Sequence, residues 1–240
     1  MIGLGTIANT LTVLVGGVIG LMVGKRLTTR FQETVLNAMA LGVMVMSIGG
    51  ILQEMLKAGA DGRLESHGLI MMVISLAVGG FIGELLNIDK GFDRFGEWIK
   101  RVSHSENDLG FVNGFVTASL TFCVGAMAIV GAFEDGLKGN PNMLYLKAVM
   151  DGITAIIFTV AMGKGTIFSA VSILIYQGAF TILARLMAPI FTPAALSYLS
   201  YVGNVLILAI GWNMIHNAKK IRVANLLPAI VLAVLLSGII

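Results

Sequence analysis

Uncharged apolar runs close to the roughly 20 residues that an α-helix needs to cross a bilayer recur along this chain, and they constrain its fold most. The chain has 240 residues, of which 57% are hydrophobic and only 12% are charged. That composition leaves too little polar surface to cover a soluble core. Helices satisfy their own backbone hydrogen bonds in lipid, so the sequence predicts an all-α polytopic membrane protein.

The apolar runs end at charges, glycines or prolines, and they divide the chain into eight predicted transmembrane helices. These cover residues 2–24, 34–56, 67–87, 109–134, 143–162, 166–187, 195–216 and 222–240. The fifth and sixth are separated only by Gly163, Lys164 and Gly165, so seven helices are the alternative. We expect one transmembrane domain over residues 1–240.

Basic residues predict the orientation of this domain. Of the 16 Lys and Arg residues, eleven lie in the connections after the odd-numbered helices: Lys25, Arg26, Arg30, Lys90, Arg94, Lys100, Arg101, Lys164, Lys219, Lys220 and Arg222. By the positive-inside rule this side is cytoplasmic, which places both termini outside. Because the basic residues are spread over short connections, they do not form the single basic surface of a nucleic-acid-binding protein.

The longest connection, residues 88–108, has the pattern of an amphipathic helix. Its Phe92, Phe95, Trp98 and Val102 recur at helical intervals, with basic residues between them. We expect this segment to lie flat on the cytoplasmic leaflet, with membrane lipids as its partners.

An internal repeat relates the first two predicted helices to the third and fourth. Residues 14–20 (LVGGVIG) return as residues 77–83 (AVGGFIG), and residues 46–56 (MSIGGILQEML) return as residues 127–137 (MAIVGAFEDGL). Each copy crosses the membrane twice, so the copies have one orientation, and a parallel repeat about an axis along the membrane normal is expected. The glycine ridges of the two copies, Gly16, Gly20 and Gly24 and then Gly79 and Gly83, predict close helix packing, across the pseudo-symmetric pair of first and third helices or between subunits of a homo-oligomer.

The repeat aligns Gln53 and Glu54 with Glu134 and Asp135, at the outer ends of the second and fourth predicted helices. The fifth begins on the same side, with Lys147 and Asp151 four residues apart and therefore able to pair. One interpretation is a helix-end ion pair near the interface, and the other is an acidic mouth that attracts cations.

Polar residues also occur inside the predicted spans. At about 100° per residue, the fourth helix places Asn113, Thr117, Thr121, Val124, Ala128, Gly131 and Asp135 on one face, with Glu134 at its edge. Gln177 and Asn204 lie deep in the sixth and seventh helices. Such groups serve either interhelical hydrogen bonding or a polar pathway.

Enzyme signatures are absent from the sequence. It has no HExxH, no GxSxG and no Walker loop, and its three histidines lack ligand spacing. We therefore expect neither catalysis nor a bound metal or cofactor.

Four segments carry a resemblance to a known family: GTIANTLTVLVGGVIG, FCVGAMAIVGAFEDGL, KAVMDGI and IYQGAF. They resemble the YqgA-type family of uncharacterised bacterial inner-membrane proteins, over essentially the whole chain. The resemblance implies an inner-membrane location and a candidate transport role, without naming a substrate.

These features lead to one functional hypothesis, a transporter or channel for a small solute or ion. Its polar pathway runs along the fourth predicted helix to an acidic outer mouth, where a desolvated Asp135 exchanges a proton. The residues assigned to the pathway are Asp135, Glu134, Asp151, Glu54, Asn113, Thr117, Thr121, Gln177 and Asn204. The alternative is a non-transporting scaffold or sensor, in which polar groups only hold helices together.

Overall fold

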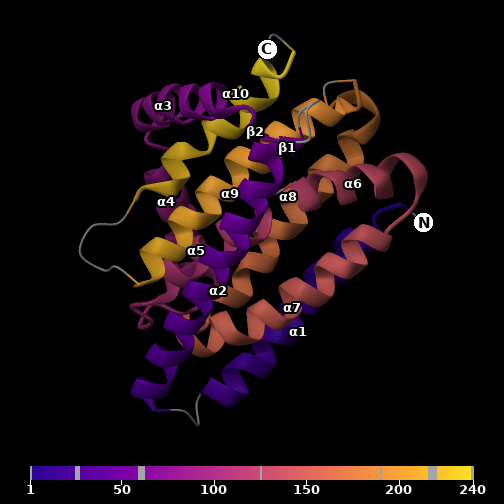
Figure 1. The fold of residues 1–240 in the computed structure, drawn as a ribbon. Helices are drawn as coiled ribbons and strands as arrows, with labels where there is room; N and C mark the ends of the chain where they lie inside the picture. Colours follow the sequence, from indigo (N-terminus) through magenta and orange to yellow (C-terminus); the bar gives the residue numbers. More distant parts are fainter. Residues whose placement is uncertain are drawn as a thin grey trace. The chain divides into compact units, whose positions relative to one another are not determined.

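The structure is a computed structural model that describes residues 2–24, 28–58, 63–124, 126–189, 191–215 and 221–238. It confirms the all-α fold class (Figure 1). In chain order the elements are α1 (Leu4–Gly24), α2 (Thr29–Met55), β1 (Leu56–Ala58), β2 (Leu64–Ser66), α3 (Leu69–Leu86), α4 (Ile88–Val102), α5 (Phe111–Cys123), α6 (Ala126–Lys138), α7 (Asn142–Met162), α8 (Gly165–Met187), α9 (Pro193–Ile215), the 3-10 helix η1 (Val223–Leu226) and α10 (Pro228–Leu236).

Among the described residues, 6 helices are long and apolar enough to cross a membrane, or up to 7 if α5 and α6 form one bent span. The fifth and sixth predicted helices are separate, because α7 ends at Met162 and the next residue, Gly163, has a φ of 83°, which suits glycine rather than a helix interior. The eighth predicted helix corresponds to η1 and α10, which together form a shorter apolar stretch, Val223–Leu236.

The helices pack in two compact units. The first contains α1, α5, α7, α8 and most of α4 and α6, and the second contains the hairpin, α3, α9, η1, α10 and most of α2. In the first unit α1 lies along α7 and also contacts α8, which packs on α5 (Figure 1). In the second unit α3 packs on η1 and α10, and α10 packs on α9.

Both predicted glycine ridges are sites of close packing. A Cβ atom added at Gly16 would lie 2.3 Å from the backbone oxygen of Gly152 in α7, and one at Gly20 would lie 2.4 Å from that of Ile156. In the second unit, a Cβ atom at Gly79 would lie 2.3 Å from the backbone nitrogen of Ala229, and one at Gly83 would lie 1.8 Å from the backbone oxygen of Asn225. The glycines thus let helix backbones approach closely, but the partners are α7 in one unit and η1 with α10 in the other, which are not the partners that the prediction named.

The fourth predicted helix is not the continuous helix expected over residues 109–134. The chain bends by 61° between α5 and α6, so the face from Asn113 to Asp135 does not run along one straight helix. The sequence there, Cys123–Val124–Gly125, includes a residue that disfavours the helix interior, and the regular 100° projection took no account of it. The continuous stripe is therefore a wrong prediction. Its members are divided between α5 (Asn113, Thr117 and Thr121) and α6 (Ala128, Gly131 and Asp135), and Val124 lies between the two helices.

Two further elements, the hairpin of β1 and β2 and the helix α4, lie in segments that the sequence analysis treated as connections. The antiparallel hairpin pairs Leu56 with Ser66 and Ala58 with Leu64, where the sequence predicted only a connection. The predicted amphipathic segment over residues 88–108 contains α4, and its place on the cytoplasmic leaflet stays a prediction. Phe95 and Ile99 of α4 pack against Phe115 of α5, whereas Trp98 and Val102 are exposed.

Several residues used above lie outside the described ranges. Lys25, Arg26, Lys219 and Lys220 contribute to the predicted orientation, and Gly125 and the final residues 239–240 belong to predicted helices. The predictions that depend on them stay predictions.

Candidate functional site

Seven buried polar residues gather in the first unit, on four helices, and we call them the polar core. They come from α1 (Thr6 and Asn9), α6 (Asp135), α7 (Lys147 and Asp151) and α8 (Gln177 and Thr181). Asn9, Asp135 and Gln177 are each 0% exposed. Burial of this many polar groups among apolar helices is costly unless they bond to one another, so their contacts decide what the core can do.

The ion pair of the polar core lies within α7. Lys147 Nζ donates a hydrogen bond to Asp151 Oδ2 over 2.6 Å, and both side chains are about one-tenth exposed. Asp151 is the tenth of the 21 residues of α7, which places it about 14 Å along the helix from the first residue. The pair is thus near the middle of the helix, and the helix-end interpretation does not fit this position.

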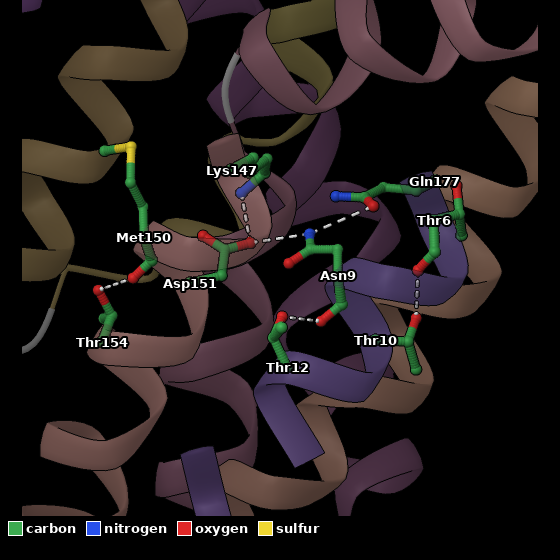
Figure 2. A network of polar contacts seen from close by, with 9 residues as sticks. All are labelled: Thr6, Asn9, Thr10, Thr12, Lys147, Met150, Asp151, Thr154 and Gln177. Atoms are coloured by element: carbon green, nitrogen blue, oxygen red, sulfur yellow. Dashed lines mark hydrogen bonds and ion pairs between the residues drawn. The ribbon is translucent and has the colours of Figure 1, made fainter. Parts of the chain in front are cut away.

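Asn9 connects the ion pair to α8. Its Nδ2 donates to Asp151 Oδ2 over 3.0 Å and to Gln177 Oε1 over 3.3 Å, so one amide joins three helices (Figure 2). One turn earlier on α1, the hydroxyls of Thr6 and Thr181 lie 3.2 Å apart. Our sequence analysis singled out Asp151 and Gln177 but missed Asn9. The sequence feature that could have identified Asn9 is an amide side chain inside a membrane helix that contains no charge.

Asp135 caps the start of α1 from another helix. Its Oδ1 accepts a hydrogen bond from the Gly3 backbone N–H over 3.1 Å, and its Oδ2 accepts one from Gly5 over 3.0 Å. The first N–H groups of a helix have no partner within the helix, and a carboxylate there also complements the helix dipole. Glu134, the preceding residue, is only half-buried. Asp135 therefore positions the helix that carries Asn9.

Two atoms of the polar core are buried without a partner. Among the residues that the structure describes, neither Asn9 Oδ1 nor Gln177 Nε2 makes a hydrogen bond. One atom is an acceptor and the other is a donor, and they belong to amides that already touch through Nδ2 and Oε1. An unsatisfied buried polar group costs about 1–3 kcal/mol. The two atoms are therefore the part of the polar core whose hydrogen bonding is incomplete.

The remaining predicted pathway residues lie on α5 and in the second unit. On α5, Asn113 is exposed, whereas Thr117 and Thr121 are half-buried and joined by a 2.8 Å bond from Thr121 Oγ1 to the Thr117 carbonyl. At the end of α5, Phe122 stacks on Phe158 of α7 with ring centroids 6.0 Å apart, so this end of α5 packs against the helix that carries the ion pair.

In the second unit, two of the predicted pathway residues, Glu54 and Asn204, form hydrogen bonds with residues of that unit. Glu54 accepts a 2.6 Å hydrogen bond from Ser197, and Asn204 Nδ2 donates to the Ser200 carbonyl over 2.8 Å. The first bond joins α2 to α9, and the second lies within α9.

The polar core contains an ionisable pair and two amides, and this chemistry suits binding. In the part of the chain that the structure describes, no three His, Cys, Asp or Glu side chains are grouped to hold a metal ion. An amide and an ion pair in an apolar setting can select a solute by hydrogen bonds, or hold helices in place.

Comparisons with known proteins identify relatives of this chain. A family model described as "Protein of unknown function (DUF554)" matches residues 4–238. The chain is 28% identical over 228 residues to "Uncharacterized membrane protein YdfK" of Bacillus subtilis, which covers 95% of this chain and 93% of that protein. It is 29% identical over 243 residues to "Uncharacterized protein YqgA" of Escherichia coli, covering 98% and 96% of the two chains. No solved structure matches.

Proposed function

The chain belongs to the DUF554 family, in which it has a relative named as a membrane protein, and we propose that it is a transporter or channel for a small solute or ion. The observation that carries this proposal is the polar core. An ion pair near the middle of a membrane-span candidate, with two unpartnered amide atoms beside it, is expensive to keep in lipid. Function is the usual reason for retaining such groups.

The bend between α5 and α6 supports the same proposal. Transporters commonly bind their substrates where a transmembrane helix is interrupted, because the interruption frees backbone groups and lets a pathway pass. Here α5 ends at Cys123 and contacts α7, the helix that carries Lys147 and Asp151. We propose that the pathway follows Thr117 and Thr121 on α5 to the polar core, with Glu134 near its outer end and without any catalytic step.

The proposed membrane arrangement has eight spans in a bacterial inner membrane. It counts α5 with α6 as one bent span and η1 with α10 as the last, and it retains the parallel repeat, in which the glycine ridges of α1 and α3 correspond. Both termini are then extracytoplasmic. A reporter fused after Ile240 should behave as extracytoplasmic, and one inserted between Asp89 and Ser105 as cytoplasmic. The same side for both would contradict eight spans.

A flux measurement tests the transport proposal. Purified protein in liposomes should admit at least one of a panel of probes (urea, acetamide, glycerol, Na⁺, K⁺ and Cl⁻) faster than empty liposomes do. The variant Lys147→Met/Asp151→Asn removes both charges together, so no lone charge remains in the core. We expect it to fold and to lose most of that flux. Equal flux of every probe with wild-type and empty liposomes would instead favour a scaffold or sensor.

A further inference from the structure

We propose that Asn9 Oδ1 and Gln177 Nε2 recognise an uncharged solute group that offers one hydrogen-bond donor and one acceptor, such as an amide, urea or hydroxyl group. This inference rests on the proposed transport function and specifies its substrate class. It concerns α1 and α8, which contact each other in the first unit.

The hydrogen-bond inventory of the two amides supports this assignment. Both N–H groups of Asn9 are used, by Asp151 and Gln177, which leaves Oδ1 as an acceptor. Gln177 Oε1 is used by Asn9, which leaves Nε2 with its two hydrogens. Both residues are 0% exposed. A ligand that donates to Oδ1 and accepts from Nε2 removes both desolvation costs at once.

The two free atoms belong to adjacent side chains. The amides touch through the 3.3 Å hydrogen bond from Asn9 Nδ2 to Gln177 Oε1. In Figure 2 both free ends lie on the side of their amides that faces Lys147 and Asp151. Because Asn9 Nδ2 bonds directly to Asp151 Oδ2, the ligand group would lie beside this contact and not between the two residues.

The charges of the polar core argue for an uncharged ligand. Lys147 and Asp151 compensate each other, and the Asp135 carboxylate faces two backbone N–H groups at the positive end of α1. A bare ion would add an uncompensated charge to this balanced, buried set, and such a charge costs several kcal/mol. A neutral group that carries a donor and an acceptor adds none.

The test compares neutral and ionic probes in the same liposomes. Entry of urea, acetamide or glycerol is followed by light scattering after an osmotic step, and entry of Na⁺ and Cl⁻ by isotope uptake. We expect wild-type protein to speed the entry of at least one neutral probe and to leave both ions at the rate of empty liposomes. Gln177→Met keeps the size but removes the Nε2 donor, together with the Oε1 atom that accepts from Asn9, so it should slow that entry by about tenfold. The exposed Gln53 provides the matched control, Gln53→Met, which should retain the wild-type rate.

Each contrary result has a distinct meaning. If Na⁺ or Cl⁻ enters and no neutral probe does, transport stands and the inference is overturned. If no probe enters, the transport proposal and this inference both fail. If neutral probes enter equally through wild type and Gln177→Met, the two amide atoms hold a structural water only, and the assignment is wrong. Should Gln177→Met fail to fold, the comparison of neutral and ionic probes with the wild type still decides the substrate class.

Discussion

Replacing Lys147 alone by Met should destabilise the protein much more than replacing Lys147 and Asp151 together. The single change leaves the Asp151 carboxylate buried without its cation, and loss of one partner of a buried pair costs about 3–5 kcal/mol. Asp151→Asn should have a similar effect, because it leaves the Lys147 ammonium alone. The double variant has no lone charge, and the amide oxygen that replaces the carboxylate can still accept from Asn9, so its stability should lie within about 1 kcal/mol of wild type.

Reversible unfolding in mixed detergent micelles measures these differences in the free energy of unfolding. The control is the exposed ion pair between Arg222 and Glu84 in the second unit, whose side chains are 61% and 58% exposed. Glu84→Gln should cost less than about 1 kcal/mol, because water and salt screen exposed pairs. If Lys147→Met proves as mild as Glu84→Gln, the α7 pair is solvated in the membrane and its assignment to a dry polar core is wrong.

The predicted helices follow from hydrophobic runs, and these are local in sequence. The span candidates α1, α2, α3, α7, α8 and α9 all correspond to predicted helices, since length and apolarity alone decide whether a helix can cross lipid. The glycine ridges also indicated close packing, because small residues spaced four apart share one helix face. The partners of Gly16 and Gly83, which are Gly152 of α7 and Asn225 of η1, could not be read from the pattern.

The bend and the hairpin could not be derived in the same way. Whether Gly125 sits inside a helix or at a break depends on what surrounds it, since glycine is only moderately unfavourable in helices. The strands β1 and β2 have 3 residues each, too short for a periodic signal. The amphipathic pattern of α4 was visible, but the packing of Phe95 and Ile99 on α5 was not, because a protein core and a membrane surface attract the same residues.

Some residues of the polar core could be predicted from the sequence, but their contacts between helices could not. Asp151 and Gln177 stood out because charged and amide groups are rare in apolar runs, and the spacing from Lys147 to Asp151 indicated their pairing. Their meeting with Asn9 joins residues 142 and 168 positions apart, which no local pattern reports. The same holds for Asp135. The helical projection placed Asp135 on a pathway, whereas in the structure both of its carboxylate oxygens accept hydrogen bonds from the start of α1.

The structure leads to a specific expectation for Asp135. Asp135→Ala removes two acceptors at once and leaves the N–H groups of Gly3 and Gly5 without partners, the second of them buried. At about 1–3 kcal/mol for each unsatisfied donor, we expect a loss of about 2–5 kcal/mol. Asp135→Asn should cost less, because one oxygen remains, but its NH₂ group would then face a backbone N–H donor.

Glu134→Gln is the matched control, one residue away and half-buried, and its effect should be below about 1 kcal/mol. Unfolding in mixed micelles gives the stabilities, and amide hydrogen exchange of residues 3–6 reports whether the start of α1 frays. Because α1 carries Asn9 one turn beyond the capped residues, fraying should also loosen the contact of Asn9 with Asp151 and Gln177, and flux should fall in parallel with stability. A proton-exchanging Asp135 on the pathway predicts a different pattern, in which Asp135→Asn changes flux while stability and exchange near Gly3 and Gly5 stay at wild-type values. That pattern would show that the cap on α1 contributes little and that the carboxylate acts on the solute itself.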